Sequence, residues 1–178
     1  FGRGLYATAS YTRSEQKVLF DGGGDQLLNT WSLTQTSNTG NNAGLSYFGG
    51  NVPDRVIGSL SLRREYFKNF ATNISLFFEA SNQGRFSYTY TTDFNRDGQT
   101  NDLIYIPRDP SEITFSPRAA VVSNGQTIVP AYTGQQQSDA FFAYIEQDDY
   151  LKNNKGKYAE RNGGVQPWRN QVDLRLSQ

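Results

Sequence analysis

A long run of alternating residues, Ala71–Tyr90, constrains this chain more than any other feature. Every second residue from Thr72 is mostly apolar, and the series ends in Phe86, Tyr88 and Tyr90, whereas the residues between them are mostly polar. Because side chains alternate across a strand, this period of two predicts a β-strand with one apolar and one polar face. Strands of soluble proteins usually have about 5–6 residues, whereas a tilted strand that crosses a bilayer needs roughly 9–11. The length therefore predicts a membrane-spanning strand whose polar side chains face an aqueous lumen.

Three further stretches show the same alternation. With 71–90 included, the predicted strands cover residues of about 3–19, 54–67, 71–90 and 166–178. Only a few residues separate the second and third strands, so these two are expected to form an antiparallel hairpin with its turn at Lys68-Asn69. The intervening stretches, about 20–53 and 91–165, are predicted to be long loops, with one helix over Ser138–Leu151 that begins at Ser138.

A short turn at one end of the strands and long loops at the other are typical of outer-membrane barrels. Four strands are too few to close a barrel, because the smallest has eight. The predicted fold class is therefore all-β, an antiparallel transmembrane β-barrel segment with two long extracellular loops, and residues 1–178 form one partial barrel domain. Since the chain begins at Phe1 and contains no Met, we expect it to be a piece of a longer protein.

The alternation also predicts which side chains meet lipid and which meet water. Lipid is expected at Leu60, Leu76, Phe78 and Leu174, and water at Ser61, Glu79 and Asp173. Aromatic residues flank the apolar band and are expected to form two interfacial girdles, Tyr66, Phe67 and Phe70 at the turn and Phe86, Tyr88 and Tyr90 at the far end. The charges on the polar face form either a binding surface or a solvated, mutually paired wall: Arg63, Glu65, Glu79, Arg169, Asp173 and Arg175.

Composition excludes several functions. Lys+Arg and Asp+Glu are balanced at 17 each, so nothing indicates a nucleic-acid partner. The chain has no Cys and no His, which removes thiol chemistry, His-based triads and the usual zinc sites. Adjacent carboxylates such as Asp148-Asp149 suggest acid–base chemistry only weakly without such a partner, so we predict that the chain is not an enzyme.

One loop has the spacing of a metal site. Asp93–Asp102 places oxygen-bearing side chains at positions 1, 3 and 5 and a glycine, Gly98, at position 6, like the first half of an EF-hand calcium loop. Position 12 is Ile104 rather than Glu, so other oxygens would have to complete the site. The candidate calcium ligands are Asp93, Asn95, Asp97, Gln99, Asn101 and Asp102. The alternative is an Asx-rich turn whose side chains bond to their own backbone.

Several stretches together resemble one family. They are Pro53–Val56, Phe86–Tyr90, Asp93–Pro107, Tyr150-Leu151, Gly156–Gly163, Pro167-Trp168 and Asp173-Leu174. In this order and spacing they resemble the late barrel region of Oar-like TonB-dependent outer-membrane receptors, which are typical of Bacteroidetes and myxobacteria. The resemblance implies a barrel of about 22 strands, a plug domain and energy coupling to the TonB complex.

Three functions are kept open by these observations. The first is part of a TonB-dependent transporter or receptor that moves a bulky substrate across the outer membrane, with outer-membrane lipid, the TonB complex and a surface lipoprotein or other outer-membrane subunits as partners. The second is an outer-membrane barrel whose long loops act as an adhesin or assembly platform. The third is a soluble, calcium-stabilised β-sandwich binding module.

Overall fold

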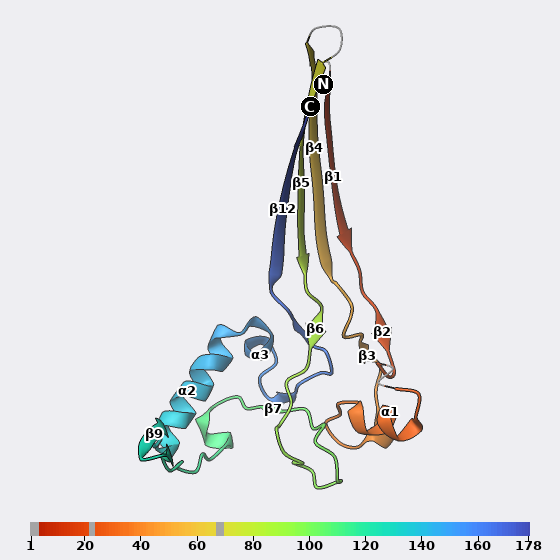
Figure 1. The fold of residues 1–178 in the computed structure, drawn as a ribbon. Coiled ribbons are helices and arrows are strands. Elements are labelled where there is room, and N and C mark those ends of the chain that lie inside the picture. The colour runs from red at the N-terminus through yellow and green to blue at the C-terminus, as the bar shows by residue number, and fades with distance from the viewer. Residues whose placement is uncertain (1–3, 22–23, 67–69) are drawn as a thin grey trace.

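A computed structural model describes residues 4–21, 24–66 and 70–178. Its largest element is one antiparallel sheet in the order β1-β4-β5-β12. The strands are β1 (Leu5–Arg13), β4 (Asp54–Tyr66), β5 (Phe70–Asn82) and β12 (Trp168–Ser177). Figure 1 shows this sheet as a tall, narrow blade with both chain ends near its tip. The structure is mostly β, with a minority of helix, which confirms the predicted antiparallel strands.

The cross-strand register keeps the two faces separate over the whole sheet. Leu60 of β4 lies opposite Ala7 of β1 and Leu76 of β5, and Leu76 in turn lies opposite Leu174 of β12. One residue along, Ser61 lies opposite Tyr6 and Ser75. Because a slip of one residue would exchange the faces, this register is the one that the sequence alternation requires.

The predicted first strand, 3–19, is too long. β1 ends at Arg13, opposite Asp54, and the chain then leaves the sheet. The reason lies in the partner strand, because Pro53 precedes β4 and has no backbone N–H to continue the ladder. The Pro53 backbone can only accept a hydrogen bond, and its carbonyl accepts one from the Ser14 N–H at 2.9 Å. Residues further on form the short strand β2 (Lys17–Val18), which pairs with β3 (Ser46–Tyr47).

The predicted strand 71–90 is also too long at its far end. β5 ends at Asn82, opposite Trp168 of β12, and Pro167 again lacks the donor for the next pair. Gly84 follows with a φ of 112°, a conformation that side chains with a Cβ rarely adopt. The predicted strand 166–178 accordingly begins at Trp168 in the structure.

The second predicted aromatic girdle is therefore wrong. Phe86, Tyr88 and Tyr90 lie beyond β5, among the loops and not on the sheet. The alternation instead places Tyr11 and Trp168 at the loop end of the apolar face, where they are 60% and 48% exposed. At the opposite end, Tyr66 lies across from Phe70. The predicted turn at Lys68-Asn69, and Phe67 with it, lie outside the described residues.

The two long connections fold together into one body at the lower end of the sheet (Figure 1), which we call the loop body: residues 14–21, 24–53 and 83–167. They contain more regular structure than the single helix predicted within them. They contain β2, β3, β6 (Arg85–Phe86), β7 (Tyr105–Ile106), β8 (Val121–Ser123), β9 (Gln126–Val129), β10 (Lys157–Tyr158), β11 (Gly164–Val165), α1 (Leu27–Leu33), α2 (Gly134–Gln147), α3 (Asp149–Asn153), η1 (Gly40–Asn42) and η2 (Pro110–Glu112).

The predicted helix over Ser138–Leu151 is present but starts earlier and is split. α2 begins after Thr133, whose side chain accepts a hydrogen bond from the Gln136 N–H, while the Thr133 N–H donates one to Gln136 Oε1. This capping box satisfies two donors that would otherwise be free, so it fixes the start before Ser138. Asp148 ends α2 and caps α3 by accepting from the Leu151 N–H at 2.8 Å.

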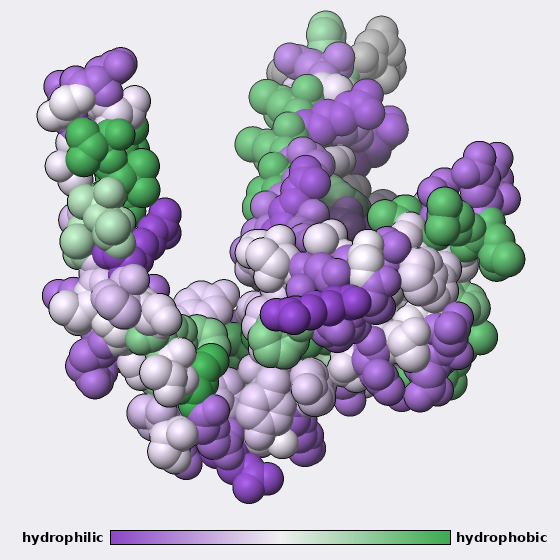
Figure 2. All heavy atoms as spheres, turned by 90° about the horizontal axis from the view of Figure 1, so that it is seen from below, coloured by the Kyte–Doolittle hydropathy of each residue, from purple (hydrophilic) through white to green (hydrophobic). Residues whose placement is uncertain are grey.

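The cluster of packed, buried hydrophobic residues lies in the loop body, whereas on the described part of the sheet the buried hydrophobic residue is the small Ala80. The cluster is made of Leu103, Ile106, Ile145, Leu151 and Ala159, each at most 5% exposed. These residues come from β7 and the segment before it, from α2 and α3, and from the segment after β10, so the core holds the parts of the second connection together. Seen from below in Figure 2, the loop body is mostly white and purple, with green confined to patches. Across the described residues, none of the helices has both the length and the apolar character to span a membrane.

Candidate functional site

The apolar face of the sheet has no covering layer among the described residues. Phe78 on this face is half-buried. Seven other large apolar side chains of the face are between 38% and 72% exposed: Leu60, Leu62, Ile74, Leu76, Val172, Leu174 and Leu176. A soluble sheet buries such a face against a second layer. Contiguous exposed apolar surfaces mark sites of interaction with lipid or protein.

The opposite face is mostly polar and partly cross-linked. Arg55 donates from Nε to Glu79 Oε1 at 2.8 Å, and Arg63 pairs with Glu65 at 2.9 Å. Gln171 donates to Asp173 at 3.0 Å along β12. Such exposed pairs contribute little to stability. Of the two alternatives for these charges, a binding surface or a solvated, mutually paired wall, the pairs agree with the wall.

The two long connections are joined by Arg161 and Asn162. Both residues are buried, with exposed fractions of 3% for Arg161 and 6% for Asn162. Arg161 donates from Nη2 to the carbonyl oxygens of Val18 and Gly44 at 2.9 and 3.2 Å. Asn162 donates from Nδ2 to the Tyr47 carbonyl at 2.8 Å. Burial lowers the pKa of the Arg161 guanidinium, whose charge is held by backbone carbonyls.

A cation–π contact supports the same junction. The Arg85 guanidinium lies 3.7 Å from the centre of the Tyr47 ring. Arg85 belongs to β6 in the second connection and Tyr47 to β3 in the first. The loop body is therefore one preorganised surface rather than two independent loops.

The structure gathers four of the six candidate calcium ligands around one turn. Asp93 accepts from the N–H groups of Asp97 and Gly98 at 3.1 and 2.9 Å, and Asn95 Oδ1 accepts from the Asp97 N–H at 2.8 Å. Asp97 Oδ1 accepts from the Gln99 N–H at 2.9 Å, and Asp102 Oδ2 accepts from the Phe94 N–H at 2.7 Å. The Asn95 and Asp97 bonds reach two residues on and are Asx-turn bonds. The Asp93 and Asp102 oxygens also accept from backbone N–H groups of this loop, which is the alternative to a metal.

The other two candidates do not join them. Asn101 is buried and donates from Nδ2 to the Thr34 carbonyl at 2.8 Å, which ties this loop to the first connection. Gln99 contributes its backbone N–H to the turn. Among the described residues no three His, Cys, Asp or Glu side chains form a group that could hold a metal. The hydrogen bonds account for the turn by themselves, and calcium stays a prediction.

Substitution and chelation separate these two accounts of the turn. Asp97→Ala removes the acceptor for the Gln99 N–H, so we expect faster protease cleavage in the following Leu103–Pro107 segment with the sheet intact. Asp139→Ala, on the exposed surface of α2, is the matched control and should cleave like wild type. If calcium holds the turn, a chelator accelerates cleavage of the wild-type protein. An unchanged rate with chelator would leave the backbone bonds as the whole explanation.

A half-buried tyrosine, Tyr88, links the segment after β6 to the helices. Tyr88 donates to Asp148 Oδ2 at 2.6 Å and stacks on Tyr150 with ring centres 6.0 Å apart. Burial, and then the bond to Asp148, raises the pKa of Tyr88 above its usual value. The folded loop body therefore favours the neutral phenol, which stabilises the folded state. This stabilisation is fully present below about pH 10 and is lost as the pH rises above it.

Tyr88→Phe tests that contribution. It removes a hydrogen bond to a charged group, which we expect to destabilise the loop body by about 1.5–3 kcal/mol at pH 8. Urea unfolding followed by near-UV circular dichroism should show this loss, and a smaller further loss at pH 11 than in wild type. Tyr132→Phe, at an exposed tyrosine, should change neither value. An equal pH dependence in Tyr88→Phe and wild type would contradict the assignment.

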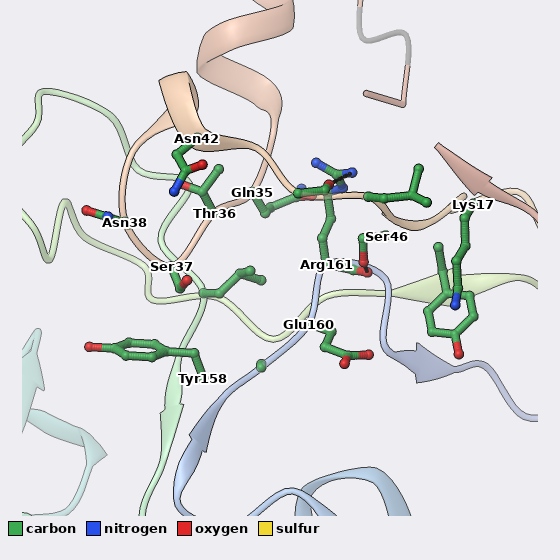
Figure 3. Close-up of a pocket in the computed structure, with 15 residues that line it drawn as sticks. Lys17, Gln35, Thr36, Ser37, Asn38, Asn42, Ser46, Tyr158, Glu160 and Arg161 are labelled. Atoms are coloured by element: carbon green, nitrogen blue, oxygen red, sulfur yellow. Dashed lines mark hydrogen bonds between the residues drawn. The ribbon is translucent and has the colours of Figure 1, made fainter. Parts of the chain in front are cut away.

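A polar cavity opens where the two connections meet. It has a volume of about 470 Å³ and is lined by the segment around β2 and β3, by Gln35–Asn38 and by Tyr158–Arg161. Figure 3 shows Tyr158 and Glu160 on one side of the opening and Thr36, Asn38 and Asn42 on the other. This cavity could not be predicted from the sequence, because its two walls are more than a hundred residues apart and carry no motif.

Comparison with known proteins finds no matching family model, no matching curated protein and no matching solved structure.

Proposed function

We propose that this chain is a segment of an outer-membrane β-barrel, within a TonB-dependent transporter or receptor that moves a bulky substrate. The single observation that carries the membrane part is the uncovered apolar face on four adjoining strands. In water such a face is unfavourable, at roughly 25 cal/mol per Å² of apolar surface. Lipid tails would cover it without a second protein layer.

The dimensions of the strands fit a bilayer. β4 and β5 have 13 residues each, which at about 3.4 Å per residue gives roughly 40 Å of strand. Tilted by about 35–45°, such a strand spans roughly 30 Å, close to a hydrocarbon core. The aromatic residues Tyr66 and Phe70 at one end and Tyr11 and Trp168 at the other take the places of interfacial girdles.

The open edges of the sheet support a larger barrel. Among the described residues, β1 and β12 each have a strand partner on one side alone. Unpaired backbone groups cannot face lipid, so further strands are required on both sides in a membrane. We infer that the remaining strands of the barrel supply them.

The transport part of the proposal rests on the resemblance to Oar-like receptors. Energy coupling, a plug and the identity of the substrate all follow from that resemblance and from no contact in the sheet. The adhesin or assembly-platform alternative fits the same barrel and uses the preorganised loop body. The soluble β-sandwich alternative is disfavoured, because a sandwich needs a second sheet on the apolar face.

Fractionation and gene deletion test the proposal in two steps. The full-length protein should remain in the outer-membrane fraction after carbonate washing and need detergent for extraction. Recovery in the soluble fraction would contradict the membrane role. Deletion should then impair uptake of a nutrient in a TonB-dependent manner, whereas loss of surface attachment with unchanged uptake would favour the adhesin.

A further inference from the structure

We infer that the cavity between the two connections is a binding site for an uncharged, polyhydroxylated ligand of the oligosaccharide class. This inference goes beyond the proposed membrane role and does not depend on it. The cavity has a suitable size, because its volume of about 470 Å³ lies within the range of roughly 300–1,000 Å³ of small-molecule sites.

The lining offers hydrogen-bonding groups that the protein itself does not use. Among the described residues, no hydrogen bond or ion pair engages the side-chain polar groups of Ser37, Asn38, Asn42, Tyr158 and Glu160. Together they provide two hydroxyls, two carboxamides and a carboxylate, which are both donors and acceptors. A ligand dense in hydroxyl groups matches this mixture, because each hydroxyl both donates and accepts.

An aromatic platform lies at the edge of the cavity. Tyr158 is 48% exposed, and its ring is supported by Tyr105, with ring centres 5.4 Å apart at 64°. The ring therefore has a fixed orientation and a free surface. The apolar C–H face of a sugar ring packs on such a surface while the tyrosine hydroxyl stays available for a polar contact.

Charge argues against an ionic ligand. Glu160 places an unpaired carboxylate in the lining, which would repel an anion. Lys17 is held by Glu15 at 3.0 Å, and the Arg161 guanidinium is 3% exposed and bonds to backbone carbonyls. The accessible lining is thus mostly neutral and polar, with no concentrated charge of either sign.

The cavity is preformed, which lowers the cost of binding. Thr36 is fixed by the Leu103 N–H, which donates to its carbonyl at 2.8 Å, and by its own N–H to the Asn101 carbonyl at 3.1 Å. On the other wall, the Ala159 N–H donates to the Ile104 carbonyl at 2.8 Å. The two walls are therefore attached to the same core segment, Asn101–Ile104.

Calorimetry on the full-length protein in detergent tests the inference. The probes are the neutral hexasaccharides of 1,4-linked glucose (α and β), mannose and xylose, together with hexagalacturonate as an anion, the glucosamine hexamer as a cation and the neutral peptide (Gly-Ser)3. We expect at least one neutral saccharide to bind more tightly than every other class of probe. The expected dissociation constant is about 1 mM or lower, so the saccharides are tested up to roughly 10 mM. The inference is overturned if no neutral saccharide binds in this range, or if a charged or peptide probe binds more tightly.

Two variants locate the binding. Tyr158→Ala should weaken the bound saccharide roughly tenfold, and Asn42→Ala, at an exposed side chain that is not expected to affect folding, about three- to tenfold. Tyr132→Ala is the matched control at an exposed tyrosine outside the cavity and should bind like wild type. Binding unaffected by both cavity variants would place the ligand elsewhere and reject this site.

Discussion

Leu76→Arg is expected to destabilise the membrane-inserted protein by about 2–4 kcal/mol, the cost of a charged side chain near the bilayer midplane on the lipid face of a barrel. Leu76 lies in the middle of the apolar face, between Leu60 and Leu174, and is 38% exposed. The lost stability is measured by urea unfolding of the full-length protein refolded into phosphatidylcholine vesicles.

The control for Leu76→Arg is an arginine on the polar face. Ser75→Arg should cost much less, although Ser75 lies directly opposite Arg175 and the two like charges repel. Ser61→Arg avoids that repulsion, because its neighbours across the sheet are Tyr6 and Ser75. Equal losses for Leu76→Arg and Ser61→Arg would mean that the assignment of the two faces is wrong.

Ile106→Ala should unfold the loop body selectively. Ile106 is 0% exposed and belongs to the cluster that joins β7 to α2 and α3. Replacing a fully buried Ile by Ala typically costs 2–5 kcal/mol, because the removed atoms leave a cavity. Limited proteolysis should show much faster cleavage within 83–167, whereas the sheet, which takes no part in this cluster, should remain resistant.

Ile128→Ala is the matched control for that variant. Ile128 lies in β9 and is 63% exposed, so its replacement should change stability by less than about 0.5 kcal/mol. If Ile106→Ala releases the strands as readily as the loop body, the two parts fold as one cooperative unit and the core described above is not separate.

The sheet could be predicted because its information is local. Alternation along β4, β5 and β12 is regular, and a short connection makes β4 and β5 neighbours, so strand number, the pairing of β4 with β5 and the two faces follow from the sequence. The ends of the strands do not follow from alternation. They are set by Pro53 and Pro167, which lack donors, and by Gly84, whose positive φ turns the chain away.

The loop body could not be predicted for a different reason. Its strands have two to four residues, and all but the local hairpin of β8 and β9 pair with partners far along the chain, such as Tyr105 with Tyr158. Its junction depends on Arg161 and Asn162, whose bonds reach residues 115 to 143 positions away. The start of α2 did carry a signal, because Thr133 and Gln136 have the spacing of a capping box. Weighing that spacing would have corrected the predicted start at Ser138.

The Asp93–Asp102 turn has a spacing that fits two motifs. Asp93, Asn95 and Asp97 suit both a calcium loop and an Asx turn, because each places oxygen-bearing side chains at alternate positions of a tight turn, toward a cation in the first and toward backbone N–H groups in the second. The folded loop satisfies these oxygens with N–H donors, and Asn101 is directed to Thr34 instead. Ligand spacing alone therefore could not decide between the two.

The central claim is that the sheet spans the outer membrane with the loop body outside and the hairpin end in the periplasm. The chain has no Cys, so single cysteines can be placed at Gln126, within the 120–135 segment of the loop body, and at Glu65, near the hairpin end of β4. A membrane-impermeant maleimide applied to intact cells should label Gln126→Cys, whereas Glu65→Cys should react only after the outer membrane is permeabilised. Labelling of Glu65→Cys on intact cells, with Gln126→Cys protected, would contradict this topology.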